Sequence, residues 1–349
     1  MTSAGKRKSH SLQWLFCCAC LLLLSACGST DKPLQLSGYG LGTSWHVTLL
    51  PGQNEVDEAT VQALVEGQLG RVNRSMSTYL PASEINRFNA STLGVWQQPS
   101  ADFLKVLDAA IDIGGKTAGG YDITIGPLVD LWGFGPGEPR IGMPSRQAVS
   151  EAKAQVGLDS LERRDEEARR LKPIELDFSS IAKGYAVDLI AEALLANDVN
   201  DFLVEVGGEM RVAGASPRGD AWRVAIEQPI VERREVATAI NLVDQSVATS
   251  GDYRNYFDLN GTRYSHTIDP RTGYPVRHDL VSVTVVHDSA MLADAWATAL
   301  TVLGAEGAAQ LAEELQLAVY FIRSEGEDFI ASHSTAFEPY LAEKRVSAD

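Results

Sequence analysis

Cysteine is absent from most of this chain of 349 residues. Its four occurrences, Cys17, Cys18, Cys20 and Cys27, all lie near the N-terminus. This placement excludes a disulfide framework and a cysteine-based zinc site in the rest of the chain. The sequence also has no Walker phosphate loop, no Gly-x-Ser-x-Gly nucleophile elbow and no Cys/His pattern with zinc-ligand spacing. These absences argue against P-loop nucleotide hydrolases, serine hydrolases of that type and zinc proteins.

Basic residues are also few, with 30 Lys and Arg against 46 Asp and Glu and a formal net charge of −16. Binding to nucleic acid requires Lys and Arg that neutralise phosphates, so nucleic acid is not an expected partner. The same acidity disfavours a purely electrostatic hold on anionic lipid. The hydrophobic content of 45% is that of an ordinary globular protein with a sizeable core.

The N-terminus has the organisation of an export signal. Three basic residues at positions 6–8 precede an apolar run from Leu12 to Leu24, which is shorter than the roughly 20 residues that span a bilayer. The following Ser25-Ala26-Cys27 completes a sequence that resembles the bacterial lipobox, in which the cysteine is acylated and becomes the first mature residue. We therefore predict a signal peptide over residues 1–26 and a tether over residues 27–37. An ordinary cleaved signal, in which Cys27 is incidental, is the alternative.

This N-terminus predicts a protein anchored through Cys27 on the periplasmic side of a bacterial membrane. Loss of the signal removes three cations and no acids, which takes the net charge from −16 to −19. Acyl chains, rather than surface charge, would then hold the protein at the membrane.

Hydrophobic periodicity and turn residues predict a mixture of helices and strands without regular alternation, which favours an α+β fold over a doubly wound sheet. A charge run over 163–170 is interpreted as a solvated loop, and the Gly- and Pro-rich stretch 119–137 as an ordered loop region. Helices are expected over 56–76, 101–116, 145–157, 180–197, 288–303 and 306–315. Strands are expected over 39–50, 174–177, 202–212, 222–227, 236–241, 263–268 and 281–286, with a final strand pair over 319–330.

The stretch Ala290–Gly304 carries the most chemical information. Asp294 is its only charge, and the helix is apolar all round, which indicates burial. A buried carboxylate requires a cationic partner. Thr298 and Thr301 lie on the same face as Asp294, at i+4 and i+7, and these oxygens suit a hard ion such as Mg²⁺. The alternative is an Asp294–Arg pair with Thr298 bonded back to the helix backbone.

A second stretch, residues 177–185, runs from a strand end into a helix start. A helix N-terminus presents free N–H groups and a positive dipole end, which suit a phosphate. Lys183 lies in the first turn, where a cation opposes the dipole unless an anion accompanies it. A serine cap with a surface lysine is the alternative.

A third stretch, residues 263–276, places His266 at a strand end before a tight turn over Asp269–Gly273. Histidine is the natural proton acceptor near neutral pH, although a lone histidine is often structural.

Three glycine-rich stretches are candidates for ligand loops. Residues 38–42 lead into a strand-like segment and not into a helix, so a Rossmann loop is excluded. Gly207-Gly208 indicates a bulge or backbone close to a ligand. Gly119-Gly120-Tyr121-Asp122 fits a turn and a ligand loop equally well.

Taken together, these stretches resemble the ApbE family of FAD:protein FMN transferases, over about Gly38 to Gly304. The resemblance rests on short motifs in a fixed order. They are Leu41-Gly42-Thr43, Met76-Ser77-Thr78-Tyr79, Ser83–Asn89, Gly120–Thr124, Ile181–Tyr185, Val206–Glu209, Thr249–Tyr253, Ser265–Pro270 and Ala293–Leu300.

The resemblance implies a two-lobed, T-fold-related catalytic unit over residues 38–335 and a C-terminal tail over 336–349. It implies Mg²⁺ held by Asp294, Thr298 and the backbone carbonyl of Ser180. Leu41 stands where the family often has Met, and Ala297 where some relatives have a second acid, so the third protein ligand is open. The FAD site would be lined by Leu41, Tyr79, Gly119, Gly120, Tyr121, Asp177, Lys183 and Thr267.

The implied reaction is attack by an acceptor Ser or Thr hydroxyl on the FMN-side phosphorus of FAD, with Mg²⁺ at the pyrophosphate, His266 as base and AMP as leaving group. The implied acceptor is a flavin-carrying subunit of a membrane electron-transfer complex of the Nqr or Rnf type. A Mg²⁺-dependent FAD pyrophosphatase and a non-catalytic flavin-binding lipoprotein are the alternatives.

Overall fold

A computed structural model describes residues 32–50, 56–137, 142–230, 235–251, 256–259, 262–326 and 328–342. The chain divides into two units, Met1–Lys32 and Pro33–Asp349, and the description below concerns the second. The predicted signal peptide, Cys27 and residues 28–31 of the predicted tether lie outside the described residues. Within the described part, no helix combines the length and apolar character needed to cross a bilayer.

The centre of the second unit is an eight-stranded, wholly antiparallel sheet that joins the N-terminal hairpin to strands from the second half of the chain. This arrangement confirms the α+β prediction. In sheet order the strands are β1 (Leu34–Gly40), β2 (Thr43–Leu49), β5 (Phe202–Val206), β6 (Glu209–Ala213), β9 (Ser246–Gly251), β14 (Leu280–His287), β15 (Ala318–Glu325) and β16 (Asp328–His333).

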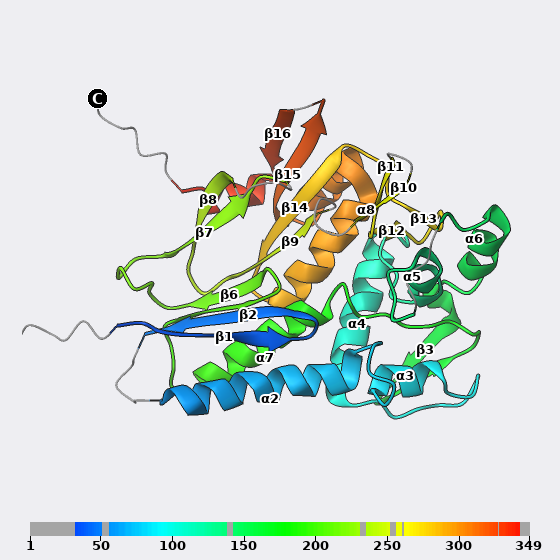
Figure 1. Ribbon diagram of the computed structural model, residues 1–349, viewed down its shortest axis with the longest axis horizontal. Helices are drawn as coiled ribbons and strands as arrows, with labels where there is room; N and C mark the ends of the chain where they lie inside the picture. The colour runs from blue at the N-terminus through cyan, green and yellow to red at the C-terminus, as the bar shows by residue number, and fades with distance from the viewer. Residues whose placement is uncertain are drawn as a thin grey trace, which may run out of the picture. The chain divides into compact units, whose positions relative to one another are not determined.

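Helices cover one face of this sheet (Figure 1). α2 (Glu58–Met76), α7 (Ala182–Leu195) and α8 (Ala290–Glu314) pack side by side and contact the strands. The remaining helices are α3 (Glu84–Asn89), α4 (Ala101–Lys116), α5 (Gly126–Trp132) and α6 (Arg146–Lys153), with 3-10 turns η1 (Leu158–Ser160) and η2 (Thr335–Tyr340).

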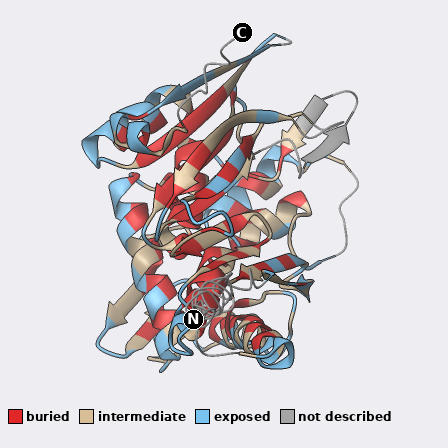
Figure 2. Cartoon of the chain, turned by 90° about the vertical axis from the view of Figure 1, so that its left-hand side faces the viewer, coloured by how far each residue is buried: buried red, intermediate tan, exposed pale blue. Residues whose placement is uncertain are grey.

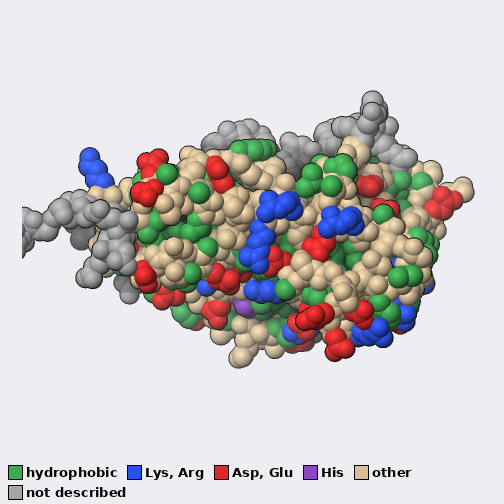
Figure 3. Space-filling view, turned by 90° about the horizontal axis from the view of Figure 1, so that it is seen from below, with side chains coloured by type: hydrophobic (Ala, Val, Ile, Leu, Met, Phe, Trp, Pro, Cys, Tyr) green, Lys and Arg blue, Asp and Glu red, His purple; other side chains and the backbone are tan. Residues whose placement is uncertain are grey.

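The sheet separates two buried clusters, because neighbouring residues of a strand point to opposite faces. In β9, Ala248 belongs to the cluster under the helices, whereas Val247 belongs to a second cluster under the hairpin β7 (Trp222–Glu227) and β8 (Val236–Leu242). Figure 2 shows buried residues concentrated along the strands and the helix faces turned to them. On the face drawn in Figure 3, acidic and basic side chains are interspersed.

Serine side chains cap the starts of α4 and α6. Ser100 accepts from the backbone N–H of Phe103 and begins α4, whose bounds agree with the prediction at both ends. Ser145 likewise caps α6, but this helix ends at Lys153 and not at Gly157. The two helices predicted over 288–303 and 306–315 are one element, α8, interrupted at Gly304, where φ is 72° and ψ is 175°.

Two segments that were each predicted as a single strand contain a hairpin turn. The segment predicted over 39–50 contains the two-residue turn Leu41-Gly42, with β1 before it and β2 after it. The segment predicted over 202–212 turns at Gly207-Gly208, which is a two-residue hairpin turn and not a bulge. Both turns have positive φ at each residue, which is the conformation that matches the twist of two antiparallel strands.

The charge run 163–170 is not a loop; this prediction was wrong. It forms the hairpin β3 (Leu161–Arg164) and β4 (Glu167–Arg170). Trp96 lies between the guanidinium groups of Arg164 and Arg169, at 4.0 and 4.3 Å from its ring centroid. These cation–π contacts stabilise a hairpin whose charges look solvated in the sequence.

Smaller differences concern short segments. Residues 174–177 make only an isolated parallel bridge, between Glu175 and Ile125. The segment predicted over 263–268 is divided between β11 (Thr262–Ser265) and β12 (Ile268–Asp269), which pair with β10 (Tyr256–Leu259) and β13 (Tyr274–Pro275) respectively. Folded structure extends beyond the predicted limits: β1 begins inside the predicted tether, and Phe337 of the predicted tail is buried in η2.

Candidate active site

A cavity of about 1180 Å³ lies where α7 and α8 meet the ends of β5, β6 and β9. Drug-sized ligands occupy cavities of roughly 300–1,000 Å³, so this volume suits a larger ligand such as a dinucleotide. Most of the site residues predicted from the sequence line it, although Gly119 does not and Cys27 lies outside the described residues. The predicted lining residues are Leu41, Tyr79, Gly120, Tyr121, Asp177, Ser180, Lys183, His266, Thr267, Asp294 and Thr298.

The close approach of α7 to α8 fixes the position of Asp294. A Cβ atom at Gly184 would collide with the carbonyl oxygen of Ala290, so only glycine allows the two helices to come this near. The backbone N–H of Gly184 then donates to Asp294 Oδ2 at 3.0 Å. Asp188 of α7 supports the same contact, because its carboxylate accepts from the backbone N–H groups of Ala290 and Met291 at the start of α8.

The predicted cationic partner of Asp294 is Lys183, not an arginine. Lys183 Nζ lies 3.5 Å from Asp294 Oδ2 and 3.4 Å from Glu209 Oε1. Burial would lower the pKa of Lys183, but the charges of Asp294 and Glu209 together hold this pKa well above its usual value. Lys183 is therefore a charged residue of the cavity wall, and the alternative of a surface lysine is wrong.

Glu209 is a further candidate site residue, and the sequence alone did not predict a role for it. It is 3% exposed, and its Oε2 has no hydrogen-bond partner among the described residues. Burial raises the pKa of Glu209 to about 8; the charge of Asp294 adds to this effect and Lys183 opposes it. The available signal in the sequence was an acid directly after the two glycines Gly207 and Gly208.

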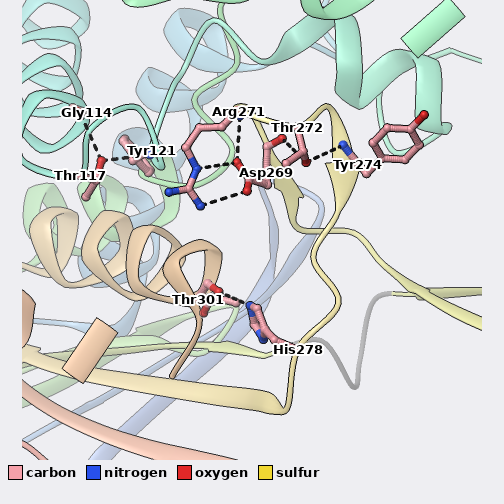
Figure 4. Close-up of polar contacts among 9 residues, drawn as sticks. All are labelled: Gly114, Thr117, Tyr121, Asp269, Arg271, Thr272, Tyr274, His278 and Thr301. Atoms are coloured by element: carbon pink, nitrogen blue, oxygen red, sulfur yellow. Dashed lines mark hydrogen bonds and ion pairs between the residues drawn. The ribbon is translucent and has the colours of Figure 1, made fainter. Parts of the chain in front are cut away.

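The loop before α7 is fixed by Tyr121. Its hydroxyl group and Ser180 Oγ are 2.9 Å apart, and the backbone N–H of Asp177 donates to the carbonyl of Ile123. Burial raises the pKa of Tyr121 well above its usual value, so the phenol stays neutral. Its backbone N–H donates to Thr117 Oγ1, which in turn donates to the carbonyl of Gly114 (Figure 4). The Gly119–Asp122 segment is thus both a turn and part of the cavity wall.

The start of α7 has no side-chain cap. The helix begins at Ala182, and its N-cap residue Ile181 makes no side-chain hydrogen bond, so the serine cap considered from the sequence is absent from this helix. Ser179 and Ser180 precede it in the cavity wall.

The hydroxyl groups of Thr298 and Thr301 in α8 have different hydrogen-bond partners. Thr298 Oγ1 lies 3.2 Å from Ser250 Oγ of β9, in the cavity wall. Thr301 Oγ1 donates to the carbonyl of Ala297, so the predicted i+7 ligand is directed back to its own helix. Thr301 also binds His278 through its carbonyl oxygen (Figure 4).

The described residues contain no group of three or more His, Cys, Asp or Glu side chains arranged to hold a metal. A cation at Asp294 would therefore depend on hydroxyl and carbonyl oxygens for its other ligands. Asp294, Thr298 and Ser180 supply such oxygens from one cavity, and a hard ion such as Mg²⁺ accepts this set together with water. The residues present fit the predicted ion.

His266 follows β11 and lines the same cavity as Asp294. Its ring lies edge-on to Phe134, with centroids 6.3 Å apart. The predicted turn after it is confirmed: Gly273 N–H donates to the carbonyl of Asp269 at 2.8 Å, and Arg271 binds the Asp269 carboxylate (Figure 4). Trp132 Nε1 donates to the carbonyl of Gly273 and ties this turn to α5.

The rim of the cavity carries an exposed aromatic ring. Tyr79 is 68% exposed, and its hydroxyl donates to the carbonyl of Phe134. Leu41, in the β1–β2 turn, has a φ of 51°, which is unusual for a residue with a side chain. These apolar surfaces suit the face of a planar ring.

Fold and cavity together define a class: an α+β protein whose helix-backed antiparallel sheet carries a large cavity that contains the Asp294–Lys183–Glu209 cluster. Comparison with known proteins identifies the member of this class. The sequence model of the ApbE family matches residues 41–321, which is most of the chain. The chain therefore belongs to the ApbE family, as the sequence motifs indicated.

Characterised relatives agree over nearly their whole length. The FAD:protein FMN transferase of Vibrio cholerae is 39% identical over 94% of this chain and 99% of its own. The enzyme of the same name from Haemophilus influenzae is 41% identical over 92% of this chain and 95% of its own. These similarities confirm the prediction of an enzyme.

Solved structures show the same fold. The flavin transferase ApbE from Vibrio cholerae superposes with a TM-score of 0.84 at 38% identity, covering 89% of this chain and 99% of its own. The apo flavinyl transferase ApbE from Pseudomonas stutzeri gives 0.82 at 36% identity, covering 89% and 97%.

Proposed function

We propose that this chain transfers FMN from FAD to a Ser or Thr hydroxyl of an acceptor protein and releases AMP, with Mg²⁺ as the required ion. The name shared by its relatives supports transfer of FMN from FAD to a protein. The observation that carries the finer proposal is that one cavity brings together Asp294, Thr298, Lys183 and His266. The cavity thus combines oxygen ligands for a cation, a positive charge for phosphate, and a base.

Asp294, Thr298 and the carbonyl of Ser180 would hold Mg²⁺, which when bound supplies charge neutralisation at the pyrophosphate and at the departing AMP phosphate. The chain's own groups bind and orient FAD. Lys183 presents an ammonium to the phosphates, and Tyr79 and Leu41 present apolar surface to a planar ring.

The transfer step forms one bond and breaks one. The acceptor oxygen bonds to the FMN-side phosphorus of FAD, and the bond from this phosphorus to the bridging oxygen of the pyrophosphate breaks, so that AMP leaves with that oxygen. The acceptor hydroxyl must lose its proton, and His266 is the residue assigned to accept it. Histidine is the side chain whose ordinary pKa lies nearest to neutral pH, which suits it to this role.

The proposed acceptor is a flavin-carrying subunit of a membrane electron-transfer complex of the Nqr or Rnf type. Acylation of Cys27 on the periplasmic side would confine the enzyme to the membrane that holds such complexes. A tether of this kind raises the effective concentration of enzyme near its acceptor without any further contact.

Product analysis tests the proposal. The purified chain is incubated with FAD and Mg²⁺, with and without an acceptor domain, and AMP and FMN are separated by chromatography. Transfer predicts that AMP release depends on the acceptor and that little free FMN accumulates. Equal release of AMP and free FMN without acceptor would indicate a pyrophosphatase, and unchanged FAD would indicate a flavin-binding protein.

A further inference from the structure

Lys183 is shared between two carboxylates that come from different parts of the fold. Its Nζ lies 3.5 Å from Asp294 Oδ2 in α8 and 3.4 Å from Glu209 Oε1 in β6. Both acids are nearly fully buried, at 3% exposure each. One cation thus serves two acids, and the cluster carries a net charge of −1 before any ion binds when both acids are ionised.

The two carboxylates are not equally well satisfied. Asp294 Oδ2 also accepts from the backbone N–H of Gly184. Glu209 Oε2, in contrast, has no hydrogen-bond partner in the part of the chain that the structure describes. A buried acceptor without a partner is rare in native proteins and calls for an explanation. An ammonium has three N–H donors, so Lys183 can satisfy more of Glu209 than it does in this state.

The position of Lys183 Nζ conflicts with a second cation at Asp294. A divalent ion bound to Asp294 would repel the ammonium, which already occupies the space beside Oδ2. The lysine side chain is 29% exposed, and its stem packs against Gly207, where a Cβ would lie 3.2 Å from Lys183 Cδ and would crowd it. The carboxylate of Glu209 is already in contact with Lys183, and its Oε2 has spare accepting capacity.

We propose that Lys183 is an exchangeable cation that neutralises Asp294 before Mg²⁺ binds, and that Glu209 is the positioning residue that receives the ammonium when Mg²⁺ takes its place. This inference rests on the Mg²⁺ site of the proposed function. Mg²⁺ adds two positive charges to the cluster, and the displaced ammonium stays in the cavity wall. The cluster therefore becomes attractive to a pyrophosphate only after the ion is in place.

The test measures Mg²⁺ binding by isothermal titration calorimetry on the full-length chain, without FAD. Loss of a residue that supports a metal ligand typically weakens metal binding ~10–100-fold, so Glu209→Gln is expected to raise the Kd for Mg²⁺ about tenfold. Glu205→Gln is the matched control. Glu205 lies opposite Met210 on the neighbouring strand, and its carboxylate binds His46 and the backbone N–H of Gly208, not Lys183. This control should bind Mg²⁺ as the wild type does.

A double-mutant cycle separates the proposal from a simple charge effect. If Glu209 acts by receiving Lys183, then Glu209→Gln should change the Kd by less than about threefold once Lys183→Met has removed the ammonium. If Glu209 only attracts Mg²⁺ through its negative charge, the tenfold loss will be the same in both backgrounds, and the proposal is overturned. An unchanged Kd in Glu209→Gln alone overturns it as well.

Thermal melts control for misfolding of the variants. The Mg²⁺-induced rise in melting temperature should rank the variants in the same order as calorimetry, because a ligand that binds only the folded state stabilises it according to its affinity. A wild-type chain that binds no Mg²⁺ would overturn both the exchange and the metal site. Failure of the proposed function would be seen separately, as absence of covalent FMN on the acceptor when Mg²⁺ does bind.

Discussion

Replacement of Asp294 by Asn gives the sharpest test of the metal site. The change keeps the size of the side chain and removes the only negative charge of the buried part of α8. In the structure Asp294 Oδ2 accepts from the backbone N–H of Gly184 and lies 3.5 Å from Lys183. An asparagine oxygen can still accept from Gly184, and Lys183 keeps Glu209 at 3.4 Å.

The expected cost in stability is therefore moderate. Removing one partner of a buried ion pair usually costs roughly 3–5 kcal/mol, because it strands the other charge. Lys183 is not stranded here, so the loss should be closer to the ~1.5–3 kcal/mol of a hydrogen bond to a charged group. Activity should collapse at ordinary Mg²⁺ concentrations and return only at far higher ones, because the ion has lost its single carboxylate ligand.

The assay combines chemical denaturation without Mg²⁺ with FMN transfer across a Mg²⁺ titration. Asp188→Asn is the comparison, since Asp188 is another buried acid but contacts Arg211, Ser289 and the start of α8 rather than the cavity. It should lose more stability than Asp294→Asn while keeping a near-normal Mg²⁺ requirement. An Asp294→Asn variant that transfers FMN at the wild-type Mg²⁺ concentration would refute the assignment of the metal site.

Four further changes have defined outcomes. Thr298→Val should shift the Mg²⁺ titration in the same direction as Asp294→Asn but by less, and an unshifted titration would remove Thr298 from the site. His266→Ala should still bind FAD, measured by flavin fluorescence, but transfer FMN about 100-fold more slowly, the usual scale for loss of a general base; a normal rate would make His266 structural. Gly184→Ala should destabilise the chain in thermal melts, because its Cβ collides with the carbonyl of Ala290; a normal melt would contradict the packing of α7 on α8. Cys27→Ser should yield an unprocessed, unlipidated precursor on gels and in mass spectra, and normal processing would contradict the lipid anchor.

Elements with local signals were predictable from the sequence. α4 was placed correctly at both ends because Ser100 caps it and apolar residues repeat at helical spacing. Several strands of the second half, such as β7, β8 and β14, were located through alternation and turn residues, but β9 of the central sheet was not predicted. The break in α8 was also visible, because Gly304 allows a backbone conformation that other residues rarely adopt.

Elements stabilised by distant partners were not predictable in this way. The β3–β4 hairpin depends on Trp96, which lies far from it in sequence and packs between Arg164 and Arg169. Its charged sequence resembles a solvated loop until that ring is in place. The start of β1 at Leu34 lies within the predicted tether, because residues 34–37 alternate apolar and polar over only four positions and become a strand through pairing with β2.

The features of the site also fall into those that have a local sequence signal and those that depend on distant contacts. Burial of Asp294 and its need for a cation follow from one helix, and the structure confirms both. The identity of that cation depends on α7 crossing α8 at Gly184, a long-range contact. Glu209 reaches the same lysine from the sheet, so its role required the fold.

The most direct test of the central claim is a peptide map of the acceptor after reaction with the chain, FAD and Mg²⁺. Mass spectrometry should find FMN joined through its phosphate to one Ser or Thr, with one AMP released for each FMN attached. Both products should be lost in Asp294→Asn. An acceptor that remains unmodified while FAD is consumed, or FMN attached without release of AMP, would contradict the account.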